Sequence, residues 1–196
     1  MKKNRLEAFS DGVLAIIITI MVLEFNVPEG HTFKDLKPLL PKVLGYILSF
    51  IYIAIYWNNH HHLMHTVEKV NGKILWANMH LLFWLSLIPF TTAWIGESEF
   101  APYPMFLYGI VLLGCAIAYY LLQKLIIKFE GKDSLIYSSV GKDNKGKLSN
   151  LLYIIAIAFA LYIPIISGVI YIIVAFIWLV PDKRIEDNFT DKKQNK

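Results

Sequence analysis

Several ionisable or strongly polar side chains lie within long apolar stretches of this sequence. They belong to the first three stretches along the chain: Asp11, His60, His61, His62, His65, Asn78 and His80. Such groups are costly at membrane depth, so each of them indicates a functional or a bracing role. The types of residue present allow two kinds of chemistry, metal binding and proton transfer.

Two pairs of histidines have the spacing of metal ligands. His61 and His65 are four residues apart, and His62 and His65 are three apart, so either pair would share one face of a helix. Two imidazoles on one face can bind zinc. The sequence shows no H-E-x-x-H motif and no evident further ligand. We therefore expect no metal site, and positive charge at the end of a helix is a sufficient role for these histidines.

Proton transfer would involve Asp11 together with His61 or His80, in a proton-coupled transporter or a proton-permeable pathway. The alternative role of Asp11 is structural. An unpaired buried carboxylate is destabilising or becomes protonated, so Asp11 needs hydrogen-bond donors. The candidate donors are Arg5, Trp57, His61 and Asn78.

The apolar stretches predict six membrane-spanning helices. The chain is 56% hydrophobic, whereas ordinary soluble domains are roughly 45–50% apolar, and a spanning helix needs about 20 apolar residues. The expected segments are residues 6–25, 39–66, 74–95, 103–128, 148–163 and 167–180. Pro164 should break or kink the chain because it lacks an N–H donor. The last two segments are therefore a bent pair or one long kinked helix.

The predicted fold class is an all-α integral membrane protein, with a membrane domain over residues 1–181 and a charged tail over residues 182–196. The single cysteine, Cys115, excludes an intrachain disulfide. The sequence contains no P-loop, no G-x-S-x-G motif and no T-V-G-Y-G filter. We therefore expect neither an enzyme nor a potassium channel with a conventional carbonyl filter.

The basic residues predict the orientation in the membrane. Most of them precede the first segment, separate the second from the third, follow the fourth or fill the tail, whereas the opposite connections contain only Lys34, Lys37 and Lys42. This asymmetry places both termini in the cytoplasm. It also accounts for the net charge of +4 without a nucleic-acid partner.

The first segment, taken as a helix, presents two different sides. Ile16, Ile20 and Leu23 follow the spacing i, i+4 and i+7, and Thr19 lies at the edge of this stripe. Asp11 points about 140° away from Ile16. The stripe faces lipid or core in an ordinary membrane helix, or a symmetry axis if the polar residues brace the helix. Periodicity alone does not separate these alternatives.

The segment from Arg5 to Asp11, Arg-Leu-Glu-Ala-Phe-Ser-Asp, resembles the R-x-x-x-F-S-D signature of the transmembrane-protein-175 family. The members of this family are endolysosomal potassium channels and their shorter bacterial relatives. Further similarities lie at Ser49-Phe50, at 56–61, at Asn78, at 87–91 and at Gly96-Glu97. The resemblance covers about the first 97 residues, and later segments match only in hydropathy and layout.

The resemblance implies a homotetramer in the lipid bilayer of the cell membrane, with one six-helix repeat per chain. Four copies of the first helix would line a central pore with an apolar constriction. The implied pore positions are Ile16, Thr19, Ile20 and Leu23. The implied function is a potassium-permeable cation channel, in which potassium is a permeant ion and no cofactor is needed. Glu24 would lie near the outer mouth, either concentrating cations or as a solvated helix end.

The resemblance also implies a polar network that ties the first helix to the second and third. Its implied members are Arg5, Ser10, Asp11, Trp57, His61 and Asn78. Which of the three consecutive histidines takes part stays open. The proton pathway and a membrane protein with a polar core but no conduction are the competing hypotheses.

Overall fold

The structure is a computed structural model that describes residues 3–67, 69–131 and 143–179. The described part is built from helices: α1 (Lys3–Leu23), the short 3-10 helix η1 (Phe33–Leu39), α2 (Leu40–His65), α3 (Gly72–Ser86), α4 (Ile88–Glu97), α5 (Pro102–Glu130), α7 (Asn144–Ala160) and α8 (Pro164–Leu179). The predicted fold class, an all-helical membrane protein, is confirmed. The predicted tail, residues 182–196, lies outside the described residues.

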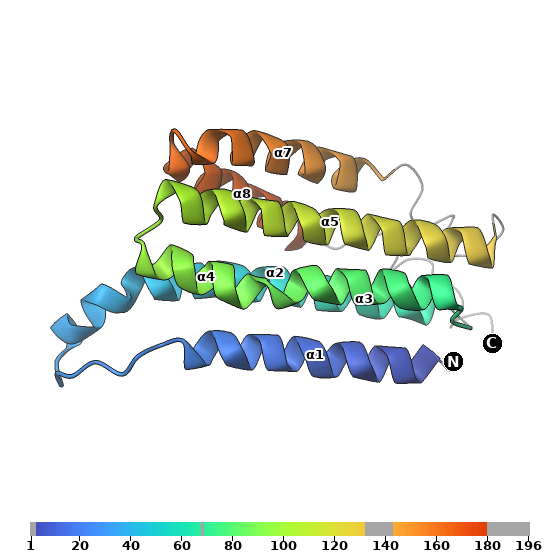
Figure 1. Cartoon of the computed structure of the whole chain (residues 1–196), viewed down its shortest axis with the longest axis horizontal. Helices are drawn as coiled ribbons and strands as arrows, with labels where there is room; N and C mark the ends of the chain where they lie inside the picture. The colour runs from blue at the N-terminus through green and yellow to red at the C-terminus, as the bar shows by residue number, and fades with distance from the viewer. Residues whose placement is uncertain (1–2, 68, 132–142, 180–196) are drawn as a thin grey trace, which may run out of the picture.

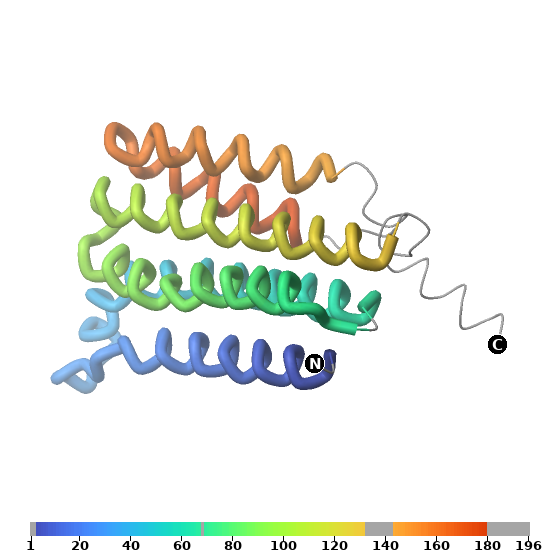
Figure 2. Tube along the Cα trace, turned by 45° about the vertical axis from the view of Figure 1, so that its right-hand side comes forward, coloured from blue at the N-terminus to red at the C-terminus, as the bar shows by residue number. Residues whose placement is uncertain are grey.

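The helices lie side by side with their axes in one general direction (Figures 1 and 2). Helix α1 forms one edge of the bundle and packs against α2, α3 and α4. Helix α5 packs against α3, α4 and α7, and α8 packs against α7, α2 and α5. The start of α1, the start of α3 and the end of α5 lie at the same end of the bundle (Figure 1). This alternation agrees with the predicted series of membrane passes.

Among the residues that the structure describes, four helical stretches are long and apolar enough to cross a membrane: Lys3–Leu23, Phe33–His65, Gly72–Glu97 and Pro102–Glu130. Helices α7 and α8 are shorter, with 17 and 16 residues. They pack against each other, and Ser167 Oγ donates a hydrogen bond of 2.6 Å from α8 to the carbonyl of Ala156 on α7. Helix α7 ends at Ala160 and α8 begins at Pro164, so the last two segments are the bent pair and not one long helix.

The third predicted segment differs from the expectation of one continuous helix, because it is divided into α3 and α4 at Leu87. Pro89 is the cause. It has no N–H to donate to the preceding turn, and its ring disfavours a continuous helix at that point. Pro89 lies in the first turn of α4, where a missing donor costs nothing.

Hydrogen bonds of buried hydroxyl groups join α2, α4, α5 and α8, which we call the scaffold. Ser49 on α2 lies 2.6 Å from the hydroxyl of Thr92 on α4 and 2.9 Å from that of Tyr108 on α5. Tyr52 of α2 donates a bond of 2.6 Å to the carbonyl of Tyr171 on α8. All five residues are buried. Four helices are therefore fixed to one another by contacts in which α1 takes no part.

Candidate pore helix and its polar contacts

Helix α1 is attached to the scaffold along one narrow stripe of buried side chains. The stripe consists of Leu6, Ser10, Leu14, Ile17 and Met21, each at most 3% exposed. Successive members are three or four residues apart, so they follow one face of a helix. This face contacts α2, α3 and α4.

The predicted pore residues lie on the uncovered side of α1, next to the buried stripe and beyond it. Ile16, Ile20 and Leu23 are 60%, 42% and 75% exposed. Thr19 is also exposed, and its hydroxyl donates a bond of 2.8 Å to the carbonyl of Ala15. The stripe therefore does not face the core of its own chain. Lipid and a second protein chain remain as its possible neighbours.

A groove lies beside this exposed stripe, between α1 and α4. It has a volume of about 690 Å³, and Ile16 and Ile20 line it from α1, while Phe90 and Trp94 line it from α4. Two carboxylates, Glu24 and Glu97, also belong to its lining. The wall of the groove is therefore apolar and aromatic with an acidic border.

A buried hydrogen-bonded trio ties α1 to the next two helices. Asn78 Nδ2 on α3 donates to Ser10 Oγ at 2.9 Å, and Ser10 Oγ donates to the carbonyl of Leu6 at 2.9 Å. Asn78 Oδ1 lies 2.7 Å from His60 Nε2 on α2. Because this amide oxygen can only accept, His60 carries its proton on Nε2 and is the donor. The side chains of Ser10, His60 and Asn78 thus connect α1, α2 and α3 by buried hydrogen bonds.

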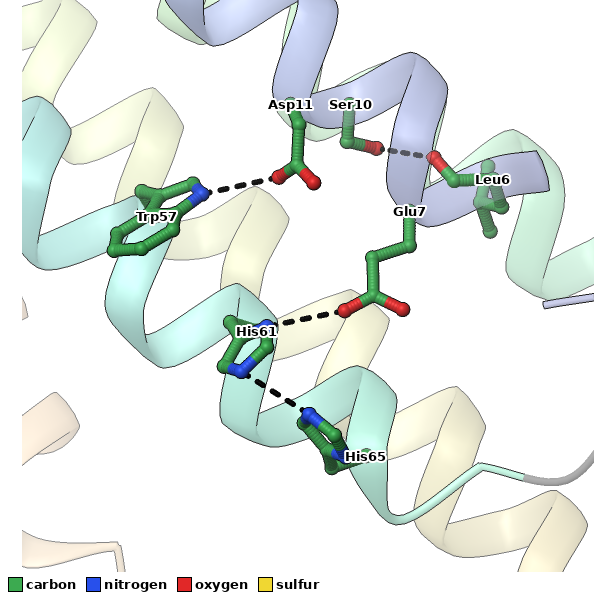
Figure 3. A network of polar contacts seen from close by, with 7 residues as sticks. All are labelled: Leu6, Glu7, Ser10, Asp11, Trp57, His61 and His65. Carbon is green, nitrogen blue, oxygen red and sulfur yellow. Dashed lines mark hydrogen bonds and ion pairs between the residues drawn. The ribbon is translucent and has the colours of Figure 1, made fainter. Parts of the chain in front are cut away.

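A second set of contacts joins α1 and α2 like the rungs of a ladder (Figure 3). Trp57 Nε1 donates to Asp11 Oδ1 at 3.0 Å, and His61 Nδ1 lies 3.1 Å from Glu7 Oε1. His65 Nε2 is 3.0 Å from His61 Nε2. The two helices run in opposite directions, so a step of four residues back on α1 matches a step of four forward on α2.

The predicted network therefore divides into two parts. Ser10 and Asn78 lie together in the buried trio, where the histidine is His60, and Asp11 contacts Trp57 in the ladder, where His61 contacts Glu7 instead. Of the three consecutive histidines, His60 therefore belongs to the buried trio and His61 to the ladder. Arg5 is exposed, and within residues 3–67, 69–131 and 143–179 its side chain enters none of these contacts.

Sequence reasoning missed Glu7, although a signal for it was present. Glu7 precedes Asp11 by four residues, and His61 follows Trp57 by four, which predicts two rungs once the helices are antiparallel. The proposed partner His80 is exposed and accepts a bond of 3.0 Å from Trp84 Nε1 on its own helix. In the described part of the chain no hydrogen bond joins His80 to Asp11.

Comparisons with known proteins agree with this architecture. The sequence profile described as endosomal/lysosomal potassium channel TMEM175 matches residues 5–89. A potassium channel of Chryseobacterium sp. (strain P1-3) is 56% identical over 191 residues, which cover 97% of this chain and 100% of that protein. The endosomal/lysosomal proton channel TMEM175 of Gallus gallus is 25% identical over 131 residues, 64% of this chain and 25% of that protein.

Among solved structures, the crystal structure of a lysosomal potassium-selective channel TMEM175 homologue from Chamaesiphon minutus matches with a TM-score of 0.77 and 26% identity. The match covers 92% of this chain and 97% of that one. It extends beyond the segments that carry the signature, so α5, α7 and α8 share the fold as well. Since a relative is more than half identical along its whole length, the resemblance is confirmed, and this chain belongs to the TMEM175 family of ion channels.

Proposed function

We propose that this protein is a potassium-permeable cation channel, formed by four copies of the chain, with α1 lining the central pore. The names of the bacterial relatives as potassium channels support it. The observation that carries the proposal is the uncovered stripe of Ile16, Thr19, Ile20 and Leu23 on an edge helix whose other side is buried against α2, α3 and α4. No catalytic step is proposed, and the permeant ions proposed are monovalent cations.

The exposed side of α1 suits a symmetry axis. Four copies placed around an axis would turn their Ile16, Ile20 and Leu23 side chains into stacked apolar rings. The neighbouring groove, with Phe90 and Trp94 on its far wall, would then receive an adjoining subunit. Association of helices in a membrane depends on van der Waals packing, and the side chains of the groove would supply such contacts.

The stacked rings would select among cations through hydration. An ion that enters an apolar constriction must shed water or carry it through at some cost, and potassium holds its water less tightly than sodium does. Thr19 supplies the one polar side chain of the stripe. Its proton is directed to the carbonyl of Ala15, so the lone pairs of its oxygen remain available to a passing cation.

The proposed location is the plasma membrane, and in the proposed orientation both termini of the chain lie in the cytoplasm. The end of the bundle that begins α1 also carries Lys69 and Lys73 near the start of α3 and Lys128 near the end of α5. The opposite end has basic residues only in the connection between α1 and α2 and the first turn of α2, at least in the described ranges. This excess of positive charge supports the proposal that this end faces the cytoplasm.

Potassium flux into liposomes that contain the purified protein tests the proposal. Ile16→Asn should raise sodium flux relative to potassium flux, because a polar ring lowers the cost for an ion that keeps its water. Leu23→Ala should raise total flux by widening a ring. Ile165→Asn is the matched control, since Ile165 is 77% exposed on α8 at the far side of the bundle. Unchanged flux and selectivity in both stripe variants would remove α1 from the pore.

The assembly is tested separately with Leu23→Cys. The only native cysteine, Cys115, is buried and free, so an introduced thiol reports on its own position. Mild oxidation should give disulfide-linked dimers from Leu23→Cys because its copies face one another, but none from Ile165→Cys. Equal crosslinking of the two variants would contradict a pore lined by α1.

Proton permeation is the second candidate function, because the vertebrate relatives are named proton channels. Asp11, Glu7 and the histidines of the ladder would supply ionisable groups along α1 and α2. Asp11→Asn distinguishes the two functions. Loss of proton flux with potassium flux retained supports proton permeation through this ladder, whereas loss of the oligomer supports a purely bracing role for Asp11.

A further inference from the structure

Three side chains with metal-binding atoms converge where α1 begins and α2 ends. Glu7, His61 and His65 each place one donor atom within 4.8 Å of the others. Figure 3 shows Glu7 descending from α1 toward His61, with His65 one turn further along α2. The sequence alone displayed only the two histidines, because the carboxylate comes from a helix that is distant along the chain.

The hydrogen bonds fix the protons of this cluster. A carboxylate only accepts, so His61 donates from Nδ1 to Glu7 Oε1 across 3.1 Å. A neutral His61 then has a lone pair on Nε2, which receives the Nε2 proton of His65 across 3.0 Å. These tautomers are assigned from the hydrogen-bond network. Both imidazoles can thus be neutral, which is the form that binds metals.

We propose that His61 and His65, supported by Glu7, bind a divalent transition-metal cation of the Zn²⁺ class. The cation would take His61 Nε2 and His65 Nε2 as ligands in place of the proton that they share. Two nitrogens on one tetrahedral zinc ion are roughly 3.3 Å apart, because each Zn–N bond is about 2.0–2.1 Å long. The two atoms are already 3.0 Å apart, so only a small adjustment is needed.

Glu7 has the role that carboxylates often have behind a metal-binding histidine. It accepts the Nδ1 proton of His61, which fixes the orientation of the ring and makes Nε2 a stronger ligand. The site is open on its outer side, since His65 is exposed and the side chain of His61 is 41% exposed. Water can therefore reach the cation and complete its coordination.

Binding would clamp α1 to α2 close to the pore stripe. Glu7 precedes Ile16 by nine residues, which is roughly 13–14 Å along a helix. A cation held by two residues of α2 and oriented by a residue of α1 would resist movement of α1 relative to the scaffold. We expect potassium flux to fall when the site is occupied. This consequence rests on the proposed channel function, whereas the binding itself does not.

Isothermal titration of the purified protein with ZnCl₂ tests the binding. The wild type should bind one equivalent of Zn²⁺ per chain, and Co²⁺ should produce a visible absorption band of a nitrogen-ligated site. His65→Ala should abolish saturable binding, and Glu7→Gln should weaken it roughly 10–100-fold. His31→Ala is the matched control, because His31 is an exposed histidine in the connection between α1 and α2; it should bind like the wild type.

Two results would overturn the proposal. One is the absence of saturable Zn²⁺ binding in the wild type, and the other is an unchanged affinity in His65→Ala. Thermal unfolding without metal verifies that each variant is folded, and Zn²⁺ should raise the melting temperature of the wild type and of His31→Ala but not of His65→Ala. The ratio of potassium flux with and without Zn²⁺ then tests the clamp. A protein that binds Zn²⁺ but conducts no potassium refutes the channel and leaves the site intact.

Discussion

The buried trio of Ser10, Asn78 and His60 provides the sharpest test of how α1 is held. Replacing Asn78 with leucine keeps the approximate volume of the side chain and removes both its donor and its acceptor. Ser10 loses less than His60, since its hydroxyl still donates to the carbonyl of Leu6. His60 is 2% exposed, and its Nε2 proton would have no acceptor. A buried donor without a partner costs about 1–3 kcal/mol.

The structure also predicts what restores the stability. His60→Leu alone leaves the Asn78 oxygen without its donor, at a cost of similar size, but the combination with Asn78→Leu replaces both partners by apolar groups, which can be nearly neutral. His60 Nδ1 already has no partner in the described part of the chain, so nothing further is lost there. The double variant should therefore be less unstable than the sum of the single variants. The coupling expected is about 0.6–1.7 kcal/mol, as for other hydrogen bonds between membrane helices.

Reversible unfolding of the purified protein in mixed micelles of mild detergent and sodium dodecyl sulfate would measure the four free energies of the cycle. Trp57→Phe, which removes the exposed bond to Asp11, is a useful comparison because an exposed polar contact should cost less. Strict additivity of Asn78→Leu and His60→Leu would refute the reasoning, since it would mean that the two side chains do not depend on each other.

Two further predictions concern packing. Leu14→Ala should destabilise the subunit by about 2–5 kcal/mol, because Leu14 is 3% exposed in the buried stripe of α1. Leu23→Ala on the same helix should change subunit stability little, since Leu23 is 75% exposed. Unfolding of the monomer in detergent measures both free energies, and equal losses would contradict the assignment of the buried and exposed sides. Ser167→Ala should destabilise the pairing of α7 with α8 by about 1 kcal/mol, because it removes a buried hydrogen bond to the carbonyl of Ala156. Faster backbone hydrogen exchange confined to these two helices would support this prediction, and unchanged exchange would contradict it.

The sequence predicted the helices well because membrane passes are long, apolar and closed by charged connections. The helix boundaries that the sequence did not predict are the division of α3 from α4 and the short helix η1. The division of α3 from α4 follows from Pro89, which lacks an N–H donor just as Pro164 does, although a break is predicted from the sequence only at Pro164. The 3-10 helix η1 has apolar residues at every third position, Phe33, Leu36 and Leu39, but seven residues are too few for this spacing to reveal it. Its N-terminus is a polar capping box of Thr32 and Asp35.

The polar contacts could be predicted by residue type but not by partner. Helical periodicity separates the two sides of α1, and the exposures of Ile16 and Ile20 agree with it. Partners depend on the rotation of α2 about its own axis, which the sequence does not specify when three histidines follow one another. A rotation of about 100° per residue turns His60 inward to Asn78 and His61 sideways to Glu7. Adjacent histidines therefore have separate roles.

These contacts have a mechanical consequence for α1. Its attachment to α2 and α3 is polar near its start, through the trio and the ladder, but beyond Asp11 its buried side chains are the apolar Leu14, Ile17 and Met21. Hydrogen bonds require defined donor and acceptor geometry, whereas apolar contacts do not depend on direction. The half of α1 that carries the exposed stripe is therefore attached by apolar packing, whereas the half that carries the signature is also attached by hydrogen bonds. If α1 lines a pore as proposed, a metal ion at Glu7, His61 and His65 would act on the hydrogen-bonded half of α1.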